Sequence, residues 1–67
     1  MDIIFNIRKN TVAFENNQYE YFGTGFCNTW KTKTGIIKYF QKRINVSSEL
    51  RNLYLLAIDA IRNYKLL

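Results

Sequence analysis

The residue types best suited to chemistry gather in one basic segment, Thr29-Trp30-Lys31-Thr32-Lys33-Thr34-Gly35. Lysines alternate with threonines there, immediately before a predicted helix whose free N–H groups and positive dipole end favour an anion. On that helix, Lys38 and Lys42 lie one turn apart on the face opposite Ile36 and Phe40. Five basic side chains therefore cluster around the helix and its entry, and they are the predicted phosphate contacts: Lys31, Lys33, Lys38, Lys42 and Arg43.

This mixture of Lys, Arg, hydroxyl and aromatic side chains is typical of surfaces that contact nucleic-acid backbones. The net charge of +5, from ten Lys and Arg against five Asp and Glu, also favours an anionic partner. Secondary contacts are expected from four further residues: Arg8, Lys9, Tyr39 and Trp30. The alternative interpretation is that the lysines form the solvated face of an ordinary amphipathic helix.

The aromatic residues of the first half of the chain allow a second kind of nucleic-acid contact. Tyr19 and Tyr21 share one face of a predicted strand, and Trp30 lies beside the basic segment. Such rings can stack on bases, as they do in sheet-based single-strand binders. In the alternative, which the composition favours, the same rings form the core beneath the helices.

Catalysis and metal binding are not predicted. The chain has one cysteine and no histidine, so Cys27 has no histidine to activate it, and a zinc site would lack ligands. We expect Cys27 to be a small buried apolar residue of a strand. The glycines of Gly23-Thr24-Gly25 do not continue into a dinucleotide-binding pattern, because Asn28 stands at the third position. The sequence therefore predicts a binding protein with no cofactor and no metal.

The length of 67 residues predicts one small domain covering residues 1–67. A 48% hydrophobic composition predicts that this domain folds. The single thiol, together with the lack of a signal peptide or a membrane-spanning run, predicts a cytoplasmic protein with no membrane contact.

The first half of the chain alternates apolar and polar residues as half-buried strands do, starting with Ile3, Phe5 and Ile7 on one face. Tight turns are predicted at Lys9-Asn10 and Asn16-Asn17, because Asn tolerates positive φ. Gly23 to Gly25 interrupt the third strand, so the residues after them form either a fourth strand or a continuation past a bulge. The expected strands cover residues 2–8, 11–14, 18–23 and 26–30.

After Trp30 the apolar period becomes helical. A short helix is predicted from Thr34 to Ile44, with Thr32 or Thr34 as its N-cap. A second helix is predicted to open at Ser47-Ser48-Glu49 and to run to the end of the chain. The expected fold is therefore α+β, a three- to four-stranded antiparallel meander followed by two helices.

The apolar surface of the second helix is wider than one sheet needs. Leu55 and Leu66 project into its polar arc, and Leu56 and Ile58 flank that arc. Isolated exposed leucines are common on protein surfaces, which is one explanation. The other is a contact with a second copy or with another protein, for which we predict three anchors: Leu55, Tyr64 and Leu66.

The order of three strands and a helix, with Thr29-Trp30-Lys31-Thr32-Lys33-Thr34 before Ile36-Ile37-Lys38-Tyr39-Phe40, resembles the AP2-like N-terminal DNA-binding domains of phage and transposon integrases. The resemblance covers roughly residues 1–44. It implies DNA binding in which the face of the sheet enters the major groove. Gly35-Ile36-Ile37 departs from the acidic and alanine residues usual in that family, and the second helix is longer and more apolar.

Two classes of function follow. In the first, a small phage or mobile-element protein binds nucleic acid through the basic segment. In the second, a phage-encoded, anti-CRISPR-like inhibitor binds a host or defence protein through the C-terminal helix. The abundance of Asn and Ile and the absence of Pro and His resemble the products of AT-rich genomes, including those of phages.

Overall fold

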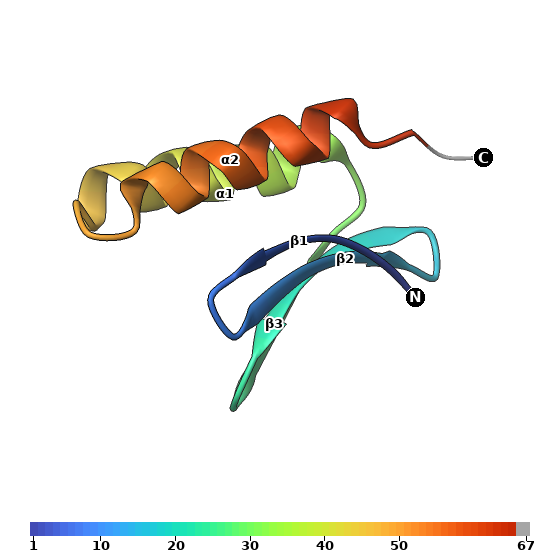
Figure 1. Ribbon diagram of the computed structural model, residues 1–67. Coiled ribbons are helices and arrows are strands. Elements are labelled where there is room, and N and C mark those ends of the chain that lie inside the picture. The colour runs from blue at the N-terminus through green and yellow to red at the C-terminus, as the bar shows by residue number, and fades with distance from the viewer. Residues whose placement is uncertain (66–67) are drawn as a thin grey trace.

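Four short strands form one antiparallel sheet in chain order, and two helices follow (Figure 1). The computed structural model describes residues 1–65. This arrangement confirms the predicted α+β meander followed by two helices, and it resolves the segment after the glycines as a separate fourth strand. The elements are β1 (Asp2–Ile7), β2 (Asn10–Glu15), β3 (Gln18–Gly23), β4 (Phe26–Trp30), α1 (Lys33–Val46) and α2 (Arg51–Asn63).

Each hairpin is closed by a two-residue turn. Asn16 and Asn17 both have positive φ, 55° and 62°, as a type I′ turn requires, and this turn is where the sequence predicts it. The first turn lies one residue earlier than predicted, at Arg8 and Lys9, with Arg8 at φ 59°. Asn10 instead begins β2, where its side-chain amide donates to the Tyr21 hydroxyl at 3.1 Å. That bond and the pairing with β1 hold Asn10 within the sheet.

A β-bulge in β1 changes which of its residues face the helices. Ile3 pairs with Ala13, but Phe5 pairs with Val12, so Ile4 is the extra residue. The bulge inverts the alternation, and Ile3 consequently turns to the open face of the sheet, where it is 62% exposed. The prediction that Ile3 shares a face with Phe5 is therefore wrong.

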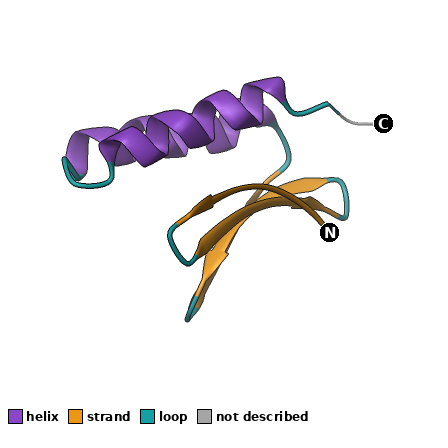
Figure 2. Cartoon of the chain, viewed as in Figure 1, coloured by secondary structure: helices purple, strands orange, loops and turns teal. Residues whose placement is uncertain are grey.

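Both helices lie on one face of the sheet, which leaves the other face open (Figure 2). The side chains between the two layers form one core. Tyr19 and Tyr21 are buried there, so the base-stacking platform is wrong and the alternative, a core beneath the helices, is right. The largest fully buried side chains are Tyr54, Phe40, Ile7, Ile36, Ile61 and Val12.

The junction between β4 and α1 is tightly packed. Thr32 is the N-cap of α1, and its hydroxyl oxygen accepts a hydrogen bond from the Gly35 N–H at 3.2 Å. The Trp30 ring lies against the first turn of the helix. A Cβ at Gly35 would come within 3.0 Å of Trp30 Cδ1, so the absence of a side chain there lets the ring approach.

The second helix begins at Arg51, later than predicted. The first helix continues to Val46, and Ser47 ends it by donating its N–H to the Arg43 carbonyl at 3.0 Å. Ser48 and Glu49 then reverse the chain direction, so the predicted hydroxyl cap does not form. Leu50, which is half-buried, stands at the N-cap without a side-chain hydrogen bond.

The central position of Phe40 leads to a stability prediction. Its ring is fully buried and lies 4.9 Å from Tyr21 and 5.7 Å from Tyr54, measured between centroids. Phe40→Ala should lower the free energy of unfolding by about 3–5 kcal/mol, because it removes a large buried side chain and leaves a cavity in the core. Leu56→Ala, at a side chain that is 54% exposed, should cost less than about 1 kcal/mol. Urea denaturation followed by circular dichroism measures both, and equal losses would contradict this account of the core.

Candidate functional site

Charge is separated between the two layers of the molecule. The strands contain three acidic residues and no Lys or Arg. Residues 21–48, which run from β3 through α1, contain no Asp or Glu and hold half of the ten basic residues of the chain. The positive charge therefore lies on the helices and the connections, and the sheet carries the opposite sign.

One side of α1 is polar, exposed and free of acidic groups. At 100° per residue, the exposed residues of this side fall within one arc opposite Ile36 and Phe40, which are buried. We call it the basic face. It consists of Thr34, Lys38, Gln41, Lys42 and Asn45.

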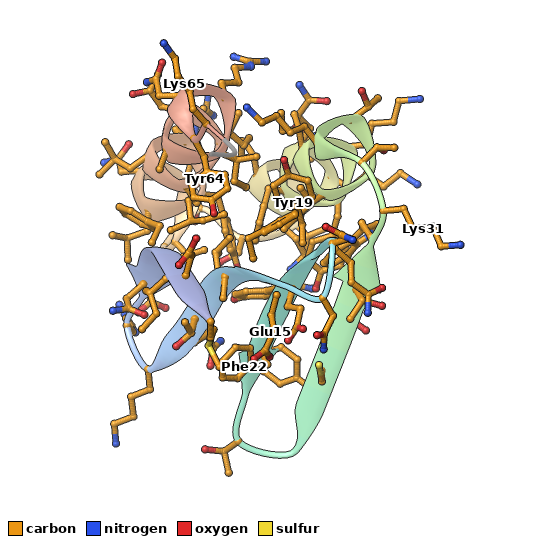
Figure 3. All side chains as sticks on the ribbon, turned by 90° about the vertical axis from the view of Figure 1, so that its right-hand side faces the viewer. Glu15, Tyr19, Phe22, Lys31, Tyr64 and Lys65 are labelled. Atoms are coloured by element: carbon orange, nitrogen blue, oxygen red, sulfur yellow. The ribbon has the colours of Figure 1, made fainter. Side chains whose placement is uncertain are left out.

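Lys31 lies just before this helix and is also exposed. Figure 3 shows its side chain extending away from the protein at the connection between β4 and α1. Lys31, Lys38 and Lys42 form no hydrogen bond or ion pair with another side chain among residues 1–65. Their ammonium groups are therefore available to an external anion.

Lys33, one of the predicted phosphate contacts, makes hydrogen bonds within the protein. Its ammonium donates to the carbonyl oxygens of Arg62, at 3.2 Å, and of Tyr64. These carbonyls lie at the end of α2, where a helix lacks internal partners for its C=O groups. Lys33 thus links the start of α1 to the end of α2. The sequence could not reveal this contact, because its partners are backbone atoms about 30 residues away.

Arg43 is exposed but points away from the basic face. Its guanidinium carbon lies 6.0 Å from the centre of the Tyr54 ring, in cation–π range. Interaction with the Tyr54 side chain raises the pKa of Arg43 above its ordinary value. Of the five predicted phosphate contacts, three therefore lie on or beside the basic face, whereas Lys33 and Arg43 make contacts within the protein.

The predicted secondary contacts are spread over the molecule. Arg8 forms an exposed ion pair with Glu49 at 2.9 Å, which joins the first turn of the sheet to the connection between the helices. Lys9 is exposed on the same turn. Trp30 and Tyr39 are half-buried and pack against each other at the entry to α1, with ring centroids 5.0 Å apart.

The open face of the sheet differs from the basic face in chemistry. Pairing between the strands places Glu20, Phe22 and Thr29 on this face, and Figure 3 labels Phe22 there and Tyr19 on the opposite, helix-facing side. Cys27, opposite Phe22, is exposed, so its predicted burial is wrong. The cysteine lies on an edge strand whose outer surface nothing covers within residues 1–65.

Two of the predicted protein-interface residues can be placed. Leu55 is 45% exposed on the outer side of α2. Tyr64 packs against Phe14 and Tyr19, and its hydroxyl donates to Asp2 Oδ2 at 2.7 Å. Tyr64 is thus held within the protein, whereas Leu66 lies outside the described residues.

Neither helix within residues 1–65 is long and apolar enough to cross a membrane. In the same residues no three His, Cys, Asp or Glu side chains converge on a possible metal position, and the surface has no pocket. Comparison of the chain with protein-family models, curated proteins and solved structures found no match.

The bond between Tyr64 and Asp2 makes stability depend on alkaline pH. The acceptor carboxylate raises the pKa of Tyr64 to about 12, from an ordinary value of 10.0. Because the protonated phenol donates this bond, its contribution is complete below pH 10 and is lost as the pH rises toward 12. Tyr64→Phe should therefore lower stability at neutral pH and show a smaller further loss between pH 10 and pH 12. Urea titrations across that range measure the difference.

Tyr39→Phe is the matched control, because its hydroxyl forms no side-chain hydrogen bond within the described part of the chain. Burial is the largest cause that raises the pKa of Tyr19 and Tyr21, and neither substitution uncovers these two side chains, so the difference between the variants reports mainly on Tyr64. Parallel pH profiles for Tyr64→Phe and the unmodified protein would contradict the role of this bond.

Proposed function

We propose that this chain is a small, non-catalytic, cytoplasmic protein of phage or mobile-element origin that binds nucleic acid through the basic face of α1 and Lys31. The observation that carries the proposal is the exposure of three lysines on a segment without an acidic residue. Phosphates would meet these ammonium groups without repulsion from neighbouring carboxylates. The charge separation between the layers would orient the protein on nucleic acid with its helices toward the phosphates, because the phosphates would repel the acidic sheet.

The composition of the basic face also suits a helix that lies along a groove. Lys38 and Lys42 are about 6 Å apart along the helix axis and can contact successive backbone positions. Gln41 and Asn45 occupy the same side, and their amides match the donor and acceptor pattern of adenine in the major groove. Thr34 adds a hydroxyl near the helix start. This arrangement uses α1 for the contact, and not the sheet face that the resemblance to the integrase domains implies.

The expected binding is weak and dependent on salt. Each neutralised phosphate contributes a slope of roughly −0.9 to the dependence of log affinity on log salt, so three lysines predict a slope near −3. Non-specific dissociation constants of about 10⁻⁴–10⁻⁶ M are typical of such contacts. A steeper slope would indicate that further basic residues take part.

The decisive variant is Lys38→Glu with Lys42→Glu. It should abolish binding to a short DNA duplex in a mobility-shift or fluorescence-anisotropy assay, because it replaces two phosphate contacts with repulsive charges. The matched control is Arg51→Glu with Lys65→Glu, which changes the net charge equally at two exposed residues outside α1. The control should retain most of the affinity. Unchanged binding by the α1 variant would refute the proposal, and equal losses in both would show attraction by net charge alone.

The second candidate function, an inhibitor that binds a host or defence protein, is favoured by one observation. Leu55 and Leu56 are 45% and 54% exposed on the outer side of α2. Leucines at such a position can anchor a protein partner. Because Tyr64 is engaged with Asp2, the apolar surface available is narrower than the sequence predicts.

A pulldown from a host lysate at high salt separates the two functions. A protein partner held by α2 should remain bound at high salt and be released by Leu55→Asp, because a carboxylate would be buried in an apolar contact. Lys38→Glu should leave that partner bound. Loss of the captured protein on addition of salt would instead favour charge-driven binding.

A further inference from the structure

The two edges of the sheet differ in how well they are protected. β1 carries the bulge at Ile4, and the side chain of its first residue, Asp2, accepts a hydrogen bond from the Tyr64 hydroxyl. β4 pairs with β3 in continuous register, without a bulge, and contains no charged residue. All its residues except Trp30 are exposed. Proteins usually protect an edge strand with a charge, a proline or a bulge, and β4 has none of the three.

The backbone groups at this edge can be identified from the hairpin. Gly23 and Phe26 flank a two-residue turn, so they form a hydrogen-bonded pair between β3 and β4. Alternation along β4 then directs the N–H and C=O groups of Cys27 and Thr29 away from β3. Within residues 1–65, these backbone donors and acceptors of Cys27 and Thr29 have no partner along the outer edge of β4.

We infer that β4 pairs with β4 of a second copy, antiparallel, about a two-fold axis at Asn28. In this register Cys27 lies opposite Thr29 of the second copy, and both use the backbone groups that face outward. All five residues of the strand are then paired. The two four-stranded sheets become one continuous sheet.

The charges of the chain are compatible with pairing between two copies despite the net charge of +5. No charged side chain lies within Phe26–Trp30, so no like charges oppose each other across the new pair. Lys31 lies opposite Gly25 of the second copy. The two Lys31 residues are therefore about 20 Å apart along the strands, beyond the screening length of about 8 Å at physiological salt.

The aromatic residues at the ends of β4 complement each other in the same register. Phe26 is 37% exposed, although its ring packs on Tyr21 with centroids 5.3 Å apart. Phe26 and Trp30 both lie on the helix-facing side of the sheet, and the two-fold axis places each beside the other residue of the second copy. A second copy therefore covers aromatic surface that the single chain leaves exposed.

The two-fold axis is perpendicular to the sheet, so the helices of both copies lie on the same side. The dimer would place two basic faces on one surface. Pairing through β4 does not require nucleic acid.

The first test is sedimentation velocity of the full chain over a range of concentrations. We expect a concentration-dependent monomer–dimer equilibrium, because one strand pair buries less surface than a standard stable interface. Thr29→Pro removes an outward N–H and leaves the pairing with β3 in place, so it should weaken dimerisation at least about tenfold. Circular dichroism establishes that the variant is folded. An unmodified chain that is monomeric at every concentration would overturn the inference.

The second test fixes the register and does not depend on the proline variant. In a background of Cys27→Ser, Asn28→Cys places two thiols opposite each other at a non-hydrogen-bonded pair, where Cα atoms are about 4.5 Å apart. Mild oxidation should give a disulfide-linked dimer. The matched control is Cys27→Ser with Asn6→Cys, an exposed position on β1. Cross-linking of Asn28→Cys no greater than that of the control would also overturn the inference.

Discussion

The whole structure depends on the burial of four rings between one face of a small sheet and two helices. Tyr19 and Tyr21 supply the sheet side of this contact, and Phe40 and Tyr54 supply the helix side. A chain of 67 residues has a small interior, so each large ring accounts for much of the apolar surface that folding removes from water. Burial of these rings determines which face of each helix packs against the sheet, and it therefore directs Lys38 and Lys42 of α1 outward.

The alternation of apolar residues was sufficient to predict the meander, and the helical period was sufficient to predict both helices. The predictions of turns and of element bounds are wrong where a tertiary contact overrides a local preference. Asn10 is a good turn residue, but its amide bonds to Tyr21 and it joins a strand. The bulge at Ile4 has no local signature, because every residue near it is compatible with a regular strand. The late start of α2 follows from the extension of α1, which local capping residues do not control.

The candidate site was predictable only in part, for a related reason. Sequence spacing correctly placed Lys38 and Lys42 on the face away from the core, because helical geometry determines that face. It could not distinguish them from Lys33, whose carbonyl partners come from a distant segment. The separation of charge between the layers likewise depends on the bounds of the strands, which the sequence does not give. A count of basic residues therefore overestimates the number that are free to contact a ligand.

The packing of α2 against β1 constrains the order in which the protein can fold. Since β1 is synthesised well before α2, its apolar residues have no cover while the intervening segments leave the ribosome. The three hairpins can form early from contacts that are close in sequence. Closure of the core must wait for α2, and the bond between Asp2 and Tyr64 joins residues 62 positions apart. Folding of this chain should therefore be completed only after most of it has been released, with the nascent sheet exposed until then.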